Sequence, residues 1–568
     1  MRTAFFLRNV PVLAGMSDEL LERLAEQVRE VRLPAGSWIM REGDLAESMF
    51  IVGGGRIEVV HEGPPEILLR VLRRGDVLGE LALLREGVRA ASARAQRDTE
   101  LLELERADFE SLIEHAPSFA LGLTRAMGAQ IAASRSPVVP AIPPRTIAIV
   151  GLDRGSPAAE VGETLAGALS AHGATARLRS GDLATIDQAE RDTQRVVLVA
   201  PGPPEDEWTR LCLSEADVVL AVTVGAPDQT WMTHVRALRG CELFVLGGPV
   251  AAGTIEELQP REVQLVADSA SRQAALESTA RRMAGRALGI VLSGGGARAL
   301  AHIGVLEELT AAGIQIDRVA GVSMGAFVGA LFAMGLDADE MDACCFEEWV
   351  QRRPLSDYTI PRHSLIRGER FRSMLDRTFG QTMIEELPRS YMSGCTELRS
   401  GRLVIARQGL LREAVGFSIC LPILAPPQVR GREIFIDGSL VDNLPVGAMA
   451  ELGEGPVIAV DVKASFERAL ATRSTTHNGT GTSADGSGIA AGRSQTRRPP
   501  NIGETLTRVL LLGSANTSEA ASRHADMVIT PRAEGVGLLE FHQLDAAREA
   551  GRAAAQEALE KGSAIRFT

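Results

Sequence analysis

The sequence predicts a multidomain protein, in which a β-rich N-terminal domain is followed by two α/β domains. Three observations predict this fold class. The chain has 568 residues, enough for several domains of about 100–200 residues each. Its first part contains short apolar runs separated by glycine turns, whereas the later parts alternate apolar strands with helical segments. The proline-rich stretch SRSPVVPAIPPR lies between the β-rich first part and the α/β parts, and it has the composition of a linker.

The changes in composition also predict the domain boundaries. We expect a β-roll in residues 1–135, a linker in 136–145, a Rossmann-like α/β domain in 146–285 and a second α/β domain in 286–568. Within the last domain, residues 466–502 are rich in Ser, Thr, Gly and Asn, and we expect a disordered insertion there.

Local patterns place the elements in order. In the first domain we expect a helix capped by Ser17, strands near residues 56–60 and 66–72, and a closing helix over 107–115. The apolar runs TIAIVG, VVLVA, ADVVLAVTV and LFVLG, with a helix from Ala158, predict a parallel sheet in the second domain. GIVLSGGG and RVAGVS begin the third domain, and ADMVITP with a final helix completes it.

Composition narrows the function. The formal charge is −13 and there is no long basic run, which argues against nucleic acid as a partner. The six cysteines show neither CxxC nor disulfide-scaffold spacing, which is typical of reduced thiols in the cytosol. No apolar run reaches the roughly 18 residues of a membrane span, and the N-terminus makes a poor signal peptide. We expect a cytoplasmic protein, and peripheral membrane contact stays open.

A candidate nucleophile lies in the segment Gly321-Val322-Ser323-Met324-Gly325, between an apolar strand and a helical segment. A serine on a sharp strand-to-helix turn needs small neighbours two residues away, because a Cβ at Gly321 or Gly325 would clash. The turn also places Ser323 at a helix N-terminus, where the helix dipole stabilises negative charge.

A glycine loop, Gly294-Gly295-Gly296-Ala297-Arg298, follows the preceding strand. Such a loop offers backbone amides to a phosphate or to the oxyanion of an acyl-transfer intermediate. The alternative is a dinucleotide fingerprint, but that motif needs an acidic residue about 20 positions on, at the end of the next strand. Here the next strand ends in Gly-Val-Ser, which disfavours it.

Asp437 follows a short β-like run and precedes Gly438 and Ser439. Alone, this pattern is typical of a turn. Together, however, the three elements resemble the patatin-like phospholipase family, whose signature is GGGxR, then GxSxG, then DG followed by Gly or Ala. The resemblance covers residues 286–465 and 503–550, and includes EAVGFSICLPILAPP and DGSLVDNLPV.

This resemblance implies a serine esterase that uses a Ser–Asp dyad without a metal or a catalytic cofactor. Ser323 is the implied nucleophile, Asp437 the base, and Gly294, Gly295, Gly296 and Arg298 the oxyanion hole. Ser439 departs from the usual Gly or Ala. It is small, so we expect it to be tolerated, although a hydroxyl beside the base can alter the hydrogen bonding of Asp437. Ala299 stands where many members have Gly. A Ser–His–Asp triad is the alternative, with these candidate histidines: His302, His363, His524 and His542.

The segment GELALLREGVRAAS, residues 79–92, is a candidate ligand site in the first domain. It can be read as a turn and hairpin with a surface Glu80–Arg89 ion pair. Together with RRGDVLGE and REGD it also resembles the phosphate cassette of cyclic nucleotide-binding domains, over residues 15–130. The resemblance implies Arg89 on the cyclic phosphate, Glu80 on the ribose hydroxyl, and cAMP more than cGMP as a regulatory ligand. The other implied lining residues are Gly79, Ala82, Ala90, Ala91 and Ser92.

The second domain lacks GxxxxGK[ST] after its first strand, so we read it as a structural spacer. The order of domains is similar to that of neuropathy-target-esterase-like proteins, which implies a lipid or lysophospholipid substrate. The alternative is a cyclic-nucleotide-controlled scaffold protein with an inactive hydrolase domain. Head-group preference, oligomeric state and allosteric control stay open.

Overall fold

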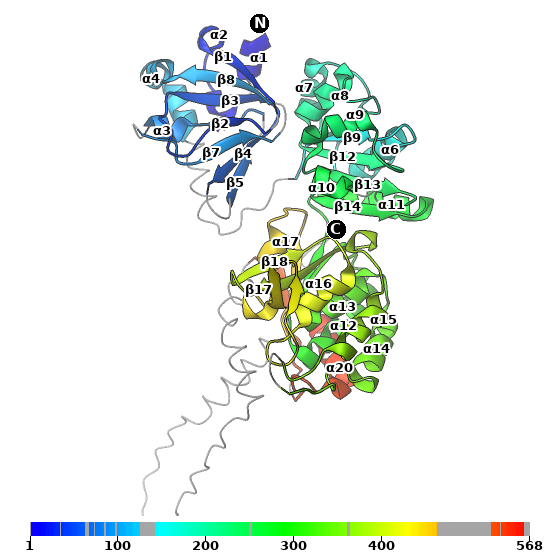
Figure 1. The fold of residues 1–568 in the computed structure, drawn as a ribbon. Helices are drawn as coiled ribbons and strands as arrows, with labels where there is room; N and C mark the ends of the chain where they lie inside the picture. Colours follow the sequence, from blue (N-terminus) through cyan, green and yellow to red (C-terminus); the bar gives the residue numbers. More distant parts are fainter. Residues whose placement is uncertain are drawn as a thin grey trace, which may run out of the picture. The chain divides into compact units, whose positions relative to one another are not determined.

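The structure is a computed structural model. It describes residues 2–8, 10–34, 36–62, 67–72, 74–84, 87–96, 99–124, 143–248, 253–360, 364–462, 524–533 and 535–561. Figure 1 draws the fold along the chain. The described residues belong to two compact units. One comprises Met1–Val139 and Pro144–Ala280, and the other Pro140–Pro143 and Arg281–Thr568. The predicted insertion and His363 lie outside the described residues.

The N-terminal part of the first unit is a β-roll of two antiparallel sheets, as predicted. The sheet orders are β1-β8-β3-β6 and β2-β7-β4-β5. Ser17 caps α2 by accepting the Leu20 amide at 3.4 Å. The strands are β1 (Arg29–Leu33), β2 (Trp38–Met40), β3 (Ser48–Gly54), β4 (Ile57–His61), β5 (Ile67–Leu72), β6 (Val77–Leu78), β7 (Ser92–Ala95) and β8 (Thr99–Glu105). The helices are α1 (Arg2–Leu7), η1 (Pro11–Leu13), α2 (Asp18–Gln27), α3 (Glu80–Leu84) and α4 (Arg106–His115).

The rest of the first unit contains a six-stranded parallel sheet of order β10-β11-β9-β12-β13-β14, which confirms the predicted α/β pattern. Its central strands are apolar because both faces are buried. The strands are β9 (Thr146–Gly151), β10 (Thr175–Leu178), β11 (Arg195–Ala200), β12 (Val218–Thr223), β13 (Glu242–Leu246) and β14 (Glu262–Val266). The helices are α6 (Ala158–Ser170), α7 (Leu183–Asp192), α8 (Glu207–Glu215), α9 (Gln229–Thr233), η2 (Val235–Leu238), α10 (Thr254–Leu258) and α11 (Ser269–Met283). The last residues of α11, from Arg281, belong to the second unit.

The second unit is built on an eight-stranded sheet of order β19-β20-β17-β16-β15-β21-β22, with β18 paired to β17. The core strands β17, β16, β15, β21 and β22 are parallel, whereas β18 and β20 run antiparallel to β17. The strands are β15 (Gly289–Leu292), β16 (Arg318–Val322), β17 (Ser390–Glu397), β18 (Arg402–Ala406), β19 (Gln428–Arg430), β20 (Glu433–Asp437), β21 (Val457–Val460) and β22 (Met527–Ile529).

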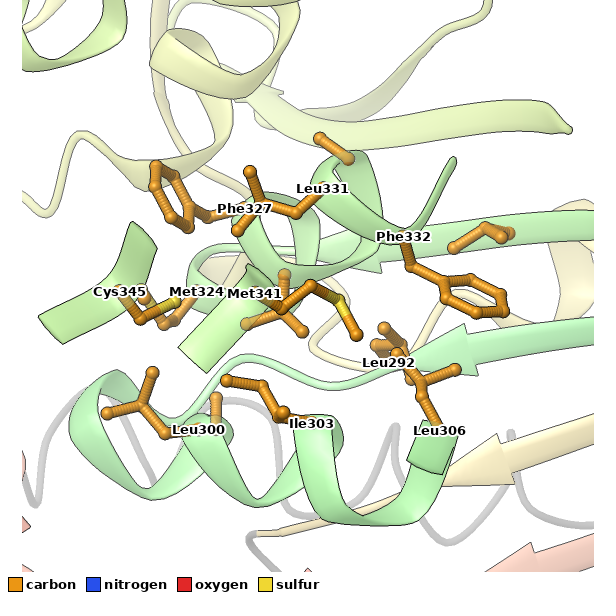
Figure 2. Close-up of a cluster of buried hydrophobic side chains, with 14 of the residues drawn as sticks. Leu292, Leu300, Ile303, Leu306, Met324, Phe327, Leu331, Phe332, Met341 and Cys345 are labelled. Atoms are coloured by element: carbon orange, nitrogen blue, oxygen red, sulfur yellow. The ribbon is translucent and has the colours of Figure 1, made fainter. Parts of the chain in front are cut away.

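Helices bury both faces of this sheet. Ile290 and Leu292 of β15 join the core with α12 and α13, while Val291 joins a smaller core with Met449 of α17. Figure 2 shows side chains from α12, α13 and α14 meeting in the larger core. The helices are η3 (Gly296–Leu300), α12 (Ala301–Ala311), α13 (Met324–Ala333), α14 (Ala338–Cys345), the π-helix η4 (Phe346–Gln351), α15 (Glu369–Phe379), η5 (Ile384–Glu386), α16 (Leu411–Ile419), η6 (Gly438–Leu440), α17 (Val446–Ala450), η7 (Phe541–Gln543) and α20 (Leu544–Lys561).

Helix α20 belongs to this second unit. A Cβ on Gly304 of α12 would lie 2.0 Å from the Arg548 carbonyl oxygen, so the two helices cross at close range. Glu307 accepts hydrogen bonds from Arg548 at 2.9 Å and from Arg552 at 2.7 Å. The last segment of the chain therefore holds the helix that follows the glycine loop.

Among the helices of the described residues, none is both long and apolar enough to cross a lipid bilayer. All six cysteines lie in the described residues, and none of them forms a disulfide.

Candidate active site

Ser323 lies on a strained turn between β16 and α13. Its backbone has φ 55° and ψ −129°, in the left-handed region that non-glycine residues rarely adopt. A Cβ on Gly321 would approach the Gly325 carbonyl oxygen to 2.4 Å, and one on Gly325 would approach the Leu292 oxygen to 2.4 Å. The structure thus gives the predicted steric reason for both glycines.

The glycine loop lies beside Ser323, because β15 and β16 are parallel neighbours with Leu292 opposite Gly321. A Cβ on Gly294 would lie 2.9 Å from the Ser323 Cβ. The loop enters the short helix η3, and α12 begins only at Ala301. Among the residues that the structure describes, the Gly295 and Gly296 amides donate to no other protein group. These amides are therefore placed to bind an oxyanion.

Asp437 ends β20 and approaches Ser323 from the other side. Strand β17 lies between β16 and β20, with Gly394 opposite Val322 and Cys395 opposite Asp437. The Ser323 Oγ donates to Asp437 Oδ2 at 2.6 Å, although 114 positions separate the two residues. Asp437 is fully buried, and this burial raises the pKa of its carboxyl group.

Ser439 contributes hydrogen bonds to the same carboxylate. Its amide donates to Asp437 Oδ1 at 2.9 Å, and its hydroxyl also bonds the carboxylate. Both contacts lower the pKa of Asp437 and so oppose part of the effect of burial. The residue that stands in place of the usual Gly or Ala therefore adds to the hydrogen bonding of this carboxylate.

Two polar residues that hold the site were not predicted. Ser418 is fully buried on α16, and its Oγ accepts the Ser323 amide at 2.9 Å and donates to the Gly394 oxygen at 2.6 Å. Asn443 donates from Nδ2 to the Gly294 oxygen at 3.3 Å, and its own carbonyl accepts the Gly294 amide at 3.4 Å. Ser418 thus anchors the turn that carries Ser323, and Asn443 anchors the glycine loop.

Ser323 and Asp437 open into a cavity of about 860 Å³, counting the space open to solvent. Its walls are mostly apolar, whereas its polar groups gather around Ser323. Trp349 of η4 and Phe541 of η7 stack at 4.6 Å in this wall, although they are far apart in sequence. The other apolar lining residues are Met324, Leu355, Phe371, Ile419, Leu421, Leu424, Ala425, Val462, Leu538 and Leu539.

The positions of Arg298 and of the histidines bear on two expectations: that Arg298 belongs to the oxyanion hole, and that a Ser–His–Asp triad is the alternative to the dyad. Arg298 lines the cavity, is buried, and donates from Nε to the Val536 oxygen at 2.8 Å. His302 is fully buried and bonds the Ser293 carbonyl at 2.8 Å, as expected for a packing role. Burial lowers the pKa of His302 to about 4, so the ring is neutral near pH 7. None of the histidines in the described part of the chain lines the cavity.

The predicted cassette in the β-roll brings Gly79, Glu80 and Arg89 together. Both charged side chains are buried, so the surface ion-pair reading is wrong. Arg89 donates to the Gly79 oxygen at 3.1 Å and to the Ser48 oxygen at 2.7 Å. Burial lowers the pKa of its guanidinium, while the charge of Glu80 opposes this shift.

The remaining cassette residues lie in α3, β7 and the loop between them. Ala82 is buried in α3, and Ala90 and Ala91 lie in the loop before β7, where Ala90 is exposed. Ser92 begins β7, where its hydroxyl accepts the Glu42 amide at 2.7 Å and donates to Glu62. Ser92 is therefore already bonded within the protein.

The polar groups at the switch point of the middle sheet bond one another. β9 and β12 are neighbours there, and a ligand of a doubly wound sheet binds at such a point. Asp153 Oδ2 accepts the Thr223 hydroxyl at 2.7 Å and the Val224 amide at 2.8 Å. This internal bonding is compatible with the structural role predicted for the domain.

Comparison with known protein families identifies two domains. The patatin-like phospholipase family matches residues 290–450, and the cyclic nucleotide-binding domain family matches residues 30–116. The regulatory domain of Toxoplasma gondii PKA with cAMP is 30% identical over 22% of this chain and 49% of that one, with a TM-score of 0.21.

Curated relatives match nearly the whole chain. An uncharacterised NTE family protein of Mycobacterium tuberculosis is 34% identical over 587 aligned positions, which cover 98% of this chain and 96% of that protein. Lysophospholipase nte1 of Aspergillus fumigatus is 26% identical, and its match covers 97% of this chain but 43% of the fungal protein. These matches confirm the predicted enzyme class, a hydrolase of carboxylic esters in lipids. The chain belongs to the NTE family, with a patatin-like phospholipase domain and a cyclic nucleotide-binding domain.

Proposed function

We propose that the chain hydrolyses the acyl ester of lysophospholipids or phospholipids with a Ser323–Asp437 dyad. The observation that carries this proposal is the 2.6 Å hydrogen bond from Ser323 Oγ to a fully buried Asp437, at the wall of an apolar cavity. The cavity is apolar enough to hold an acyl chain, and the fungal relative is named a lysophospholipase.

In the first step, Ser323 Oγ attacks the ester carbonyl carbon and passes its proton to Asp437. The tetrahedral oxyanion accepts hydrogen bonds from the amides of Gly295 and Gly296. Asp437 then returns the proton to the leaving alkoxide, which departs as the alcohol and leaves an acyl-serine. A water molecule gives a proton to Asp437 and attacks this ester. Asp437 then returns the proton to Ser323 Oγ as the acyl–oxygen bond breaks, which releases the fatty acid and restores both residues.

Burial explains how an aspartate serves as this base. An ordinary aspartate titrates near 4 and accepts a proton weakly. Removing Asp437 from water disfavours its charged form and raises its pKa, which strengthens it as a base. Direct contact with the Ser323 hydroxyl replaces the histidine of a triad.

Fatty-acid release from lysophospholipid tests the dyad. Ser323→Ala and Asp437→Asn are each expected to lower kcat by at least about 10³-fold. Asp442→Asn is the matched control, because Asp442 is another carboxylate of this loop whose pKa burial raises, yet it does not line the cavity. Hydrolysis that persists in Ser323→Ala would refute the nucleophile assignment.

We also propose that the β-roll binds a cyclic nucleotide, cAMP more tightly than cGMP. Arg89 would contact the cyclic phosphate and Glu80 the ribose hydroxyl, which their burial beside Gly79 supports. Calorimetric titration of the full chain should give cAMP binding that Arg89→Gln weakens at least about tenfold. Equal affinity in the variant would exclude the cassette as the site.

A cyclic-nucleotide-controlled scaffold with an inactive hydrolase domain is the second candidate function, favoured only by the separate ligand domain. An active-site serine phosphonate distinguishes it from the enzyme. An adduct on Ser323 supports catalysis, whereas binding of cAMP without any adduct supports the scaffold. Hydrolysis rates with and without saturating cAMP then test whether the two domains are coupled.

A further inference from the structure

Five large apolar side chains are exposed next to the cavity that contains Ser323. The exposed fractions are 72% for Tyr358, 81% for Ile360, 38% for Leu365, 52% for Ile423 and 52% for Leu539. We call these five residues the apolar rim. Single exposed apolar residues are ordinary, but a connected group marks a binding surface.

Main-chain hydrogen bonds connect the apolar rim to the cavity. The Thr359 amide donates to the Leu365 oxygen at 2.9 Å, and the Leu365 amide donates to the Ile423 oxygen at 2.7 Å. Ile423 lies between Leu421 and Leu424, and both of these line the cavity. Leu539 is itself a lining residue. The exposed apolar surface therefore continues into the apolar wall beside the nucleophile.

The backbone at Ile423 is an independent sign that this exposed side chain has a use. Ile423 has φ 72°, a conformation that is strongly disfavoured for a β-branched residue. Glycine or asparagine would adopt it at lower cost. The chain instead keeps isoleucine there, and about half of this residue is open to solvent.

The segment that carries most of the apolar rim is basic, although the whole chain has a formal charge of −13. Residues 351–372 contain six arginines but only one aspartate and one glutamate. Arg353, Arg367 and Arg370 are exposed there. Local positive charge beside exposed apolar side chains is the combination that binds an anionic lipid surface.

We propose that the apolar rim docks this domain on the surface of an anionic lipid bilayer, so that an acyl chain passes from the lipid into the cavity. This inference rests on the proposed hydrolysis of a lipid ester. Tyr358 and Ile360 enter the interface between head groups and acyl chains, where tyrosine is favoured. Arg353 and Arg367 contact the lipid phosphates.

Vesicle flotation with full-length Ser323→Ala protein tests the docking without lipid turnover. The vesicles contain phosphatidylcholine with or without phosphatidylglycerol. Adding Tyr358→Ser and Ile360→Ser is expected to weaken binding to the anionic vesicles at least about tenfold. Adding Arg353→Gln and Arg367→Gln should weaken it by a similar factor and reduce its salt dependence. Val528→Ser is the matched control, because Val528 is a 40% exposed apolar residue on β22.

Hydrolysis of a water-soluble short-chain ester separates docking from chemistry. With Ser323 intact, Tyr358→Ser/Ile360→Ser should keep this rate within about twofold and lose at least about tenfold on vesicle lipid. Vesicle binding unaffected by the rim variant, or absent from the parent protein, overturns the docking proposal. Rim-dependent binding without any ester hydrolysis leaves docking intact and refutes the proposed function. A rim-dependent dimer that ignores vesicles would assign the rim to a second copy of the chain.

Discussion

Replacing Ser418 with alanine removes the side chain that holds the backbone of the nucleophile turn. Its hydroxyl accepts the Ser323 amide at 2.9 Å and donates to the Gly394 oxygen at 2.6 Å, and the residue is fully buried. The substitution leaves two polar groups without that partner, at about 1–3 kcal/mol each. We therefore expect the free energy of unfolding of this domain to fall by roughly 2–6 kcal/mol.

Activity should fall beyond what lost stability explains. The Ser323 backbone conformation costs about 1–3 kcal/mol, and the bond to Ser418 offsets part of this cost. Without this hydrogen bond, we expect the turn to change conformation and Ser323 Oγ to move out of hydrogen-bonding position with Asp437. A displacement approaching 1 Å costs about 10²-fold in rate, so kcat should drop about 10- to 100-fold. KM should change little, because Ser418 does not line the cavity.

Steady-state kinetics on a soluble ester, well below the unfolding temperature, measure this effect. Ser393→Ala is the control, because Ser393 is equally buried and donates to the Ala414 oxygen at 2.9 Å. That control should lose stability but keep its kcat within a few-fold. Ser418→Thr keeps the hydroxyl and should recover most of the lost kcat, at some cost from its extra methyl group. Equal kcat losses in Ser418→Ala and Ser393→Ala would refute the positioning role.

Three further predictions concern the domain of Ser323, and one control variant lies on α6 of the first unit. Activity should decline as pH falls through the pKa of Asp437, which burial raises. Ser439→Ala should move this acid limb of the pH–rate profile to higher pH, because the substitution removes a hydrogen bond that lowers the pKa of Asp437. An unmoved pH–rate profile contradicts this prediction. Gly321→Ala should abolish activity and soluble expression, because its Cβ would lie 2.4 Å from a backbone oxygen. Gly167→Ala is the control, because Gly167 lies in open space on α6, and thermal denaturation should show an unfolding free energy that is higher by about 0.5–1 kcal/mol. His302→Ala should lower the unfolding free energy by about 2–4 kcal/mol without moving the acid limb, since the ring is neutral and buried; a changed pH profile would restore the triad hypothesis.

The sequence was enough to locate the strands and turns on which the candidate site residues lie. Ser323, the glycine loop and Asp437 each follow an apolar strand, and small residues mark each turn, so local patterns located them. Their meeting was expected from family resemblance, because no local pattern specifies that β17 lies between β16 and β20. The β-roll and the parallel middle sheet were likewise predicted from runs of apolar residues.

The residues that sequence reasoning missed act through tertiary contacts. Ser418 lies among apolar residues of α16, where a serine gives no sign that its hydroxyl binds a backbone amide 95 positions away. Asn443 was visible only as a neighbour of Asp437, although it bonds Gly294 across 149 positions. The cavity wall joins η4 to η7, and the burial of Glu80 and Arg89 depends on how the β-roll closes. Such tertiary contacts leave no periodic pattern in the sequence from which they could be predicted.

The close approach of backbones explains how the Asp437 side chain reaches Ser323 without a residue between them. Neighbouring strands are about 4.8 Å apart, so β16 and β20, separated only by β17, keep their ends within about 10 Å. A Cβ on Gly438 would lie 2.4 Å from the Gly394 oxygen, and one on Gly394 would lie 2.8 Å from a Val322 methyl group. Glycine at these two positions lets the chain after β20 lie close to the nucleophile turn, so the short side chain of Asp437 reaches Ser323 directly. A larger residue at either position should therefore lengthen the Ser323–Asp437 contact and abolish catalysis even where the domain still folds. Gly394→Ala, assayed for phosphonate labelling of Ser323, is the simplest test of that geometry.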